Sequence, residues 1–141
     1  MPLTLKAACD AAIADKSLAP KNGETYCNFG LIKIMQLMGL APLSGRANQM
    51  IIAMGAEWNA VTAGRAVALA KAGKLCVAGL AGDKHGHVAV VYPADMEFSG
   101  SRKKNVPMVA NVGNKNGMMK ASGAFPSDPL YFAYPYEDHR G

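Results

Sequence analysis

The spacing of apolar residues changes at Gly73, and this change constrains the fold more than any other feature of the sequence. Before Gly73 the apolar residues recur every three or four positions, as they do in amphipathic helices. After Gly73, short apolar runs such as HVAVVY at 87–92 are bounded by turn-forming residues, which is typical of strands. Helices followed by antiparallel strands, without alternation of the two, predict an α+β fold with one helical layer on a small sheet.

The pattern predicts four helices followed by four strands. The helices are expected over 4–17, 27–38, 47–54 and 63–72. The strands are expected over 74–80, 87–92, 106–112 and 130–134. Thr62 is a good N-cap for the fourth helix, and Gly73 suits the position just beyond its end. Because 141 residues is a typical length for one domain, we expect a single domain over 1–141.

The composition excludes a disordered chain, and no segment suits a membrane. Half of the residues are hydrophobic and only 18% are charged, whereas disorder needs the opposite balance. The most apolar stretch, 29–42, contains Lys33 and Gln36 and falls short of the roughly 20 residues of a membrane span. The N-terminus has Asp10 and no uninterrupted apolar run, so no secretory signal peptide is expected. We therefore expect synthesis in the cytoplasm, with any extracytoplasmic target reached by another export route or after lysis.

Cys27 is the candidate nucleophile. It lies in the first turn of the expected helix 27–38, on the same apolar stripe as Leu31, so its side chain should face the body of the protein. The positive end of a helix macrodipole favours the thiolate, which predicts a lowered pKa for this cysteine. The alternative is a small buried side chain that only packs. Cys9 and Cys76 are interpreted as buried packing residues, and the sequence leaves open whether they form a disulfide.

His87 is the candidate general base. It opens the strand expected over 87–92 and follows Gly86, which leaves space for a substrate or a second backbone. A cysteine at a helix start and a histidine on a later strand is the arrangement found in papain-like hydrolases. The alternative is a histidine at a strand end whose ring is satisfied by a backbone carbonyl.

Asn111 is the candidate for orienting the imidazole of His87. If the strands 87–92 and 106–112 pair antiparallel with Tyr92 opposite Val106, then His87 lies opposite Asn111 and the two side chains share a face. In that register Asn111 would hold the ring through its Nδ1 atom. A slip of one residue would replace Asn111 by its neighbour, and the alternative is an asparagine that faces solvent.

Several segments together resemble a known family. They are TYCN at 25–28, Trp58 with GRAVALAKAGK at 64–74, LCVAGL at 75–80, HGHVAVVYP at 85–93 and VANVGNKNG at 109–117. Together they resemble the papain-fold peptidoglycan amidases, which include NlpC/P60 and CHAP-type cell-wall hydrolases, phage lysins and amidase effectors of type VI secretion. The resemblance covers about 26–125, and GHVAVV is its most specific piece.

The resemblance implies a papain-like fold and hydrolysis of an amide bond in the peptide part of bacterial peptidoglycan, without a cofactor. It implies that Cys27 is the nucleophile, His87 the general base and Asn111 the residue that orients the base. It also implies action in the periplasm or wall of a target cell and, for an effector, a cognate immunity protein. The alternatives are a basic binding module without activity and a papain-like acyltransferase or protein-modifying enzyme.

Two further patterns concern metals and polymers. His85 and His87 have the spacing of two ligands on one strand face, but only Asp83 accompanies them, so we expect no metal site. The basic run RKK at 102–104 is expected to be a solvated loop or a contact for an anionic polymer. The net charge of +5 suits cell wall or nucleic acid. Because no nucleic-acid-binding motif is present, nucleic acid is not an expected partner.

Overall fold

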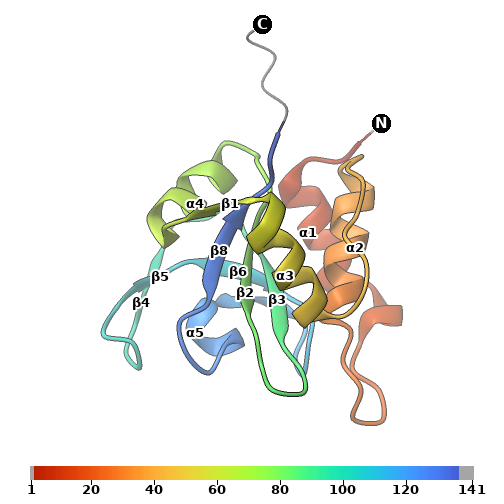
Figure 1. Cartoon of the computed structure of the whole chain (residues 1–141). Coiled ribbons are helices and arrows are strands. Elements are labelled where there is room, and N and C mark those ends of the chain that lie inside the picture. The colour runs from red at the N-terminus through yellow and green to blue at the C-terminus, as the bar shows by residue number, and fades with distance from the viewer. Residues whose placement is uncertain (1, 137–141) are drawn as a thin grey trace, which may run out of the picture.

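The computed structural model describes residues 2–136 and has an α+β architecture, as the sequence predicts (Figure 1). Its helices are α1 (Leu5–Ala14), α2 (Cys27–Leu37), α3 (Ala47–Glu57), α4 (Ala63–Lys71) and the one-turn α5 (Ala121–Ala124), with a 3-10 turn η1 (Lys16–Leu18). Its strands are β1 (Asn59–Val61), β2 (Cys76–Leu80), β3 (His87–Val91), β4 (Glu97–Ser99), β5 (Lys104–Val106), β6 (Met108–Asn111), β7 (Gly117–Lys120) and β8 (Leu130–Ala133).

An antiparallel sheet forms the centre of the described part of the chain. Its strand order is β1-β8-β2-β3-β6-β7, and β4 pairs with β5 in a separate ribbon. The helices α1 and α2 pack together and contact β6 and β3, while α3 and α4 contact β2. The consecutive residues Cys76, Val77 and Ala78 of β2 are all fully buried. Because successive side chains point to opposite faces, both faces of the sheet are covered at this strand.

Short local signals set the ends of the helices. The hydroxyl of Thr62 accepts the N–H of Arg65 at 3.1 Å, and Gly73 has a φ of +85°, so both predicted caps of α4 are confirmed. The first helix is shorter than predicted. The Asp15 carboxylate accepts the N–H of Ser17 at 2.9 Å, and this contact starts η1 as a separate turn.

The strand predicted over 106–112 is wrong, because the segment forms parts of two strands. Pro107 separates β5, which pairs with β4, from β6, which pairs with β3. Proline lacks the N–H that a continuous ladder needs. The sequence also gave no sign of β1, β4, β7 or α5. Each has three or four residues, which is too short for a periodic pattern to be recognised.

The predicted register between β3 and the strand that follows is also wrong. Val91 lies opposite Val109, and the N–H of Tyr92 donates to the carbonyl of Met108 at 2.8 Å. The sequence predicts Val106 opposite Tyr92, two residues before the observed partner Met108. Because side chains alternate with a period of two, a shift of two residues leaves every side chain on the predicted face.

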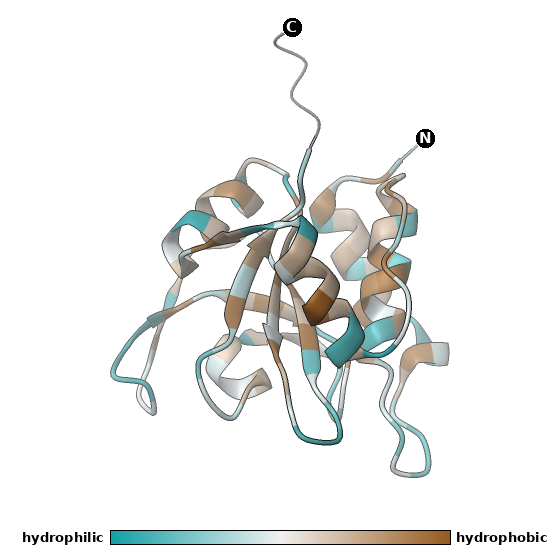
Figure 2. Cartoon of the chain, viewed as in Figure 1, coloured by the Kyte–Doolittle hydropathy of each residue, from teal (hydrophilic) through white to brown (hydrophobic). Residues whose placement is uncertain are grey.

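The hydropathy of the chain follows this architecture. Figure 2 shows brown, apolar segments gathered on the strands and helices, and teal segments in the loops and on parts of the helices. Buried hydrophobic residues from the helices and the sheet form one continuous cluster. Within residues 2–136, no helix has the length and apolar character that a membrane crossing requires.

Gly30 allows the start of α2 to lie close to the end of β6. A Cβ at Gly30 would lie 2.7 Å from Cγ2 and 2.8 Å from Cβ of Val112. Gly30→Ala should therefore lower the free energy of unfolding by about 1–3 kcal/mol, because an extra methyl here overpacks the core. In Gly55→Ala, which adds a methyl in α3 where nothing lies within 4 Å, stability should rise by up to about 1 kcal/mol. Urea unfolding measures the free energy of unfolding of both variants. Equal changes in the two variants would contradict the close approach of α2 to Val112.

Candidate active site

The three predicted site residues come from elements that meet at one end of the sheet. Because β3 and β6 are antiparallel, His87 at the start of β3 and Asn111 at the end of β6 lie at the same end. Helix α2 packs along β3. In Figure 1 the first turn of α2 lies at the lower end of the view, which is the end of the sheet where β3 begins. Cys27 is the first residue of that helix.

The Cys27 thiol lies partly buried between α2 and β3. Burial raises the pKa of the thiol above its ordinary value, although the N–H groups of Val88, Asn28 and Cys27 itself lower it in part. The lowered pKa that the sequence analysis expected from the helix start is therefore wrong, because the cost of burying a thiolate outweighs these N–H groups. In the free protein at neutral pH, Cys27 is a thiol beside the backbone of the residue that follows His87.

His87 and Asn111 are in direct contact. The Nε2 atom of His87 lies 2.6 Å from Oδ1 of Asn111, whose side chain is buried. The Nδ2 atom of Asn111 donates to the carbonyl of Lys115 at 2.8 Å. A carbonyl only accepts, so this bond turns Oδ1 toward the imidazole. The sequence predicted the right pair of residues but the wrong ring nitrogen, because the contact is to Nε2.

This hydrogen bond assigns the tautomer of the neutral ring. Because Oδ1 of Asn111 accepts, Nε2 of His87 carries the proton and Nδ1 keeps a free lone pair. Burial lowers the pKa of His87, and the hydrogen bond with Asn111 opposes that shift in part. The imidazole is therefore neutral at pH 7, with Nδ1 able to accept a proton.

Two residues that the sequence analysis did not single out enclose the imidazole. The ring of Phe125 packs against it with centroids 4.9 Å apart and an angle of 57° between the planes. A Cβ at Gly113 would lie 3.1 Å from Cε1 of His87, so the missing side chain lets the ring lie close to the backbone there. Phe125 follows a helix too short to recognise, and Gly113 is one of several glycines in a loop. Neither carries a distinguishing signal in the sequence.

Asn48 of α3 holds the loop that precedes His87. Its Nδ2 donates to the carbonyl of Gly82 at 2.8 Å, and its Oδ1 accepts the N–H of Gly82 at 3.2 Å. A Cβ at Gly86 would lie 2.1 Å from the same Oδ1. The space that Gly86 was predicted to leave is thus filled by a side chain of α3, which fixes the start of β3.

The remaining candidates do not join this cluster. His85 is exposed in the β2–β3 loop, and within residues 2–136 no group of three or more potential ligand side chains could hold a metal ion. All three cysteines are free thiols. Cys9 and Cys76 are fully buried, as predicted, and burial raises their pKa values to about 12 and about 11.

The basic run at 102–104 is not uniformly solvated, which corrects the prediction. The Arg102 side chain is only 17% exposed, and its Nε donates to Asp128 at 3.1 Å. Lys104 contacts the other oxygen of the same carboxylate at 2.5 Å. Lys103 and Lys104 are both exposed, but Lys104 belongs to β5 and only Lys103 lies in the loop.

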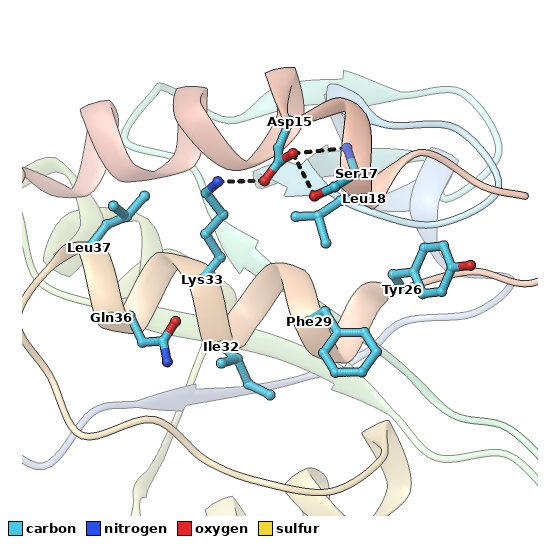
Figure 3. Close-up of a pocket in the computed structure, with 9 residues that line it drawn as sticks. All are labelled: Asp15, Ser17, Leu18, Tyr26, Phe29, Ile32, Lys33, Gln36 and Leu37. Atoms are coloured by element: carbon cyan, nitrogen blue, oxygen red, sulfur yellow. Dashed lines mark hydrogen bonds and ion pairs between the residues drawn. The ribbon is translucent and has the colours of Figure 1, made fainter.

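A shallow pocket of about 620 Å³ lies beside the start of α2 (Figure 3). Tyr26 and Phe29, which flank Cys27 in the sequence, line one part of it. Lys33 lines another part and forms an ion pair with Asp15 across to the end of α1. The pocket therefore combines aromatic surface close to Cys27 with a charge pair that is already neutralised.

No protein-family model matches this sequence, and no curated protein matches it either.

Proposed function

We propose that this protein is a papain-like cysteine amidase or endopeptidase that hydrolyses an amide bond in the peptide part of bacterial peptidoglycan. The observation that carries the proposal is the 2.6 Å contact between Nε2 of His87 and Oδ1 of Asn111, next to the strand segment that Cys27 packs against. A nucleophile, a base and a residue that orients the base are the three groups that such a reaction needs.

In the first half of the reaction, Cys27 attacks the carbonyl carbon of the substrate amide. Nδ1 of His87 takes the thiol proton while the C–S bond forms and the carbonyl oxygen becomes an oxyanion. The N–H of Cys27 at the start of α2 stabilises this oxyanion. The imidazolium then donates its Nδ1 proton to the leaving nitrogen, the C–N bond breaks, and an acyl-enzyme remains.

In the second half, water releases the acyl group. Nδ1 of His87 takes a proton from the water, whose oxygen attacks the thioester carbon. The C–S bond breaks, the proton returns to the sulfur, and the products are a carboxylic acid and the free Cys27 thiol. Asn111 keeps the ring aligned throughout and stabilises the imidazolium through the Nε2–H bond, and no cofactor takes part.

The substrate class rests on the sequence resemblance and on charge. The segments TYCN and GHVAVV resemble those of peptidoglycan amidases, and the net charge of +5 suits the acidic polymers of a bacterial wall. Such an enzyme acts in the periplasm or wall of a target cell. If it is delivered as an effector, the producing cell needs an immunity protein that blocks the site.

Purified sacculi test the proposal directly. The wild-type protein should release soluble peptide fragments that mass spectrometry identifies, and the fragments also show which bond is cut. Cys27→Ala should abolish the release because it removes the nucleophile. Cys9→Ala and Cys76→Ala, at buried positions without a role in the reaction, are the matched controls and should retain activity. Full activity of Cys27→Ala would exclude the proposed enzyme, and transfer of an acyl group without hydrolysis would favour an acyltransferase.

The pKa shifts predict a broad pH plateau for kcat/KM. The base must be neutral, and because burial lowers the pKa of His87, activity should be lost only below about pH 6.5. The nucleophile starts as a thiol, and because burial raises the pKa of Cys27, activity should fall only above about pH 8.5. A profile measured with a soluble wall peptide tests this. An acid limb above pH 6.5 or an alkaline limb below pH 8.5 would contradict these pKa directions.

A further inference from the structure

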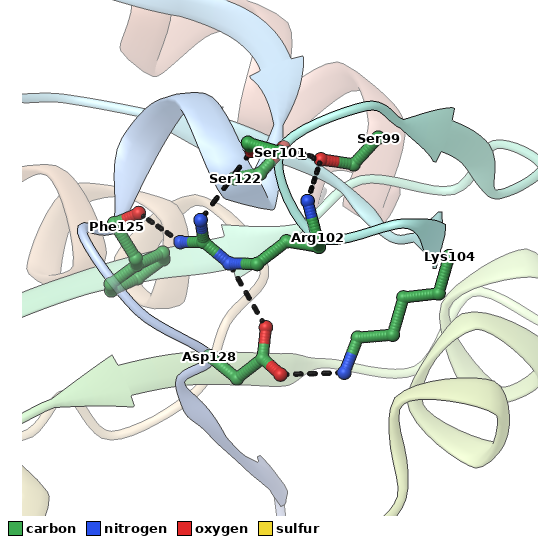
Figure 4. A network of polar contacts seen from close by, with 7 residues as sticks. All are labelled: Ser99, Ser101, Arg102, Lys104, Ser122, Phe125 and Asp128. Carbon is green, nitrogen blue, oxygen red and sulfur yellow. Dashed lines mark hydrogen bonds and ion pairs between the residues drawn. The ribbon is translucent and has the colours of Figure 1, made fainter.

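The position of Phe125 against His87 depends on two backbone contacts. Its N–H donates to the carbonyl of Ala121 at 2.9 Å across the single turn of α5. Its carbonyl accepts a hydrogen bond from Nη2 of Arg102 at 2.6 Å (Figure 4). The ring itself is buried, and it covers one side of the imidazole. A helix of one turn is too short to hold this geometry alone, so the Arg102 contact matters.

Arg102 is held in place by further partners on both sides. Its Nε donates to Asp128, which follows Phe125 in the chain. Its backbone N–H donates to the hydroxyl of Ser99 at 3.3 Å, and that buried hydroxyl donates to Ser122 of α5 at 2.8 Å. The guanidinium thus binds a carboxylate and a carbonyl at the same time, which a fixed planar group with several donors can do.

We propose that Arg102 is a positioning residue for His87, holding Phe125 against the imidazole and thereby excluding water from the His87–Asn111 hydrogen bond. The effect of Arg102 on turnover rests on the proposed function, whereas the effect of Arg102 on the imidazole does not.

The effect reaches His87 through packing. The groups that face the ring are the Asn111 amide from β6 and Phe125, with the Cys27 thiol of α2 beside the backbone of Val88. Arg102 and Asp128 carry opposite charges and meet Phe125 at its backbone. Burial is what holds the pKa of His87 down, so a looser Phe125 lets water in and raises that pKa.

Lys104 provides a matched control. Lys104 and Arg102 bind the two oxygens of the same Asp128 carboxylate, but only Arg102 also binds the carbonyl of Phe125. Arg102→Gln and Lys104→Gln therefore remove the same charge and break a contact to the same partner. Only the first should disturb the imidazole.

The experiment is an NMR titration of the His87 ring protons in the full chain, with His87→Gln used to assign the signals among the three histidines. Arg102→Gln should raise the titration midpoint by about 0.5 pH unit or more. Lys104→Gln should leave it unchanged, and Phe125→Leu should raise it. If Arg102→Gln does not fold, Arg102→Lys, which keeps the charge but lacks the planar group whose separate nitrogens reach the two partners, should give a smaller rise.

Equal midpoints in the arginine and lysine variants would overturn the proposal. On sacculi, Arg102→Gln should lower kcat roughly 10-fold and move the acid limb of the pH profile upward, as expected when a base is misplaced. A shifted titration without hydrolysis by any variant would leave the positioning role intact and would contradict the proposed function instead. The two failures are thus distinguishable.

Discussion

The antiparallel pairing of β3 with β6 is the interaction on which the rest of the site depends. It places the first residue of one strand near the last residue of the other, so that His87 and Asn111 meet, and the loop carbonyl of Lys115 orients the Asn111 amide. Helix α2 packs along β3 and brings Cys27 to the same end. Gly30 allows this approach, because its missing side chain leaves space for Val112.

Burial sets the protonation states of the two reactive groups. It raises the pKa of the Cys27 thiol and lowers the pKa of the His87 imidazole, so both groups are neutral in the free protein. The proposed reaction then begins with proton transfer between neutral groups as the substrate is attacked. Phe125 contributes to the burial of His87, and this contact links the reactivity of the base to the packing of α5 and to Arg102.

Much of the site could be predicted because its residues lie on elements with clear periodic patterns. Cys27 begins an amphipathic helix, and His87 begins the strand with the clearest sequence pattern, so both positions followed from the sequence. Asn111 was predicted from a register that is wrong by two residues. It still contacts His87, because such a shift keeps the side chain on the same face and leaves the amide within reach along the diagonal.

The rest depends on contacts that no local pattern encodes. Pro107 divides a segment that is mostly apolar, and the ribbon of β4 and β5 occupies what looked like a plain loop. Phe125 and Arg102 gain their roles only when α5 packs beside β6. The direction of the Cys27 pKa shift likewise depends on how deeply the folded chain buries the sulfur, which the helix position alone does not reveal.

The most direct measurement is the tautomer of His87, determined by NMR of the ¹⁵N-labelled imidazole at a pH where the ring is neutral. The account predicts a proton on Nε2, bonded to Asn111, and an unprotonated Nδ1 that is free to act as the base. Asn111→Ala should weaken this preference. A proton on Nδ1 in the wild-type protein would contradict the account, because the base would then have no lone pair on the nitrogen assigned to take the Cys27 proton.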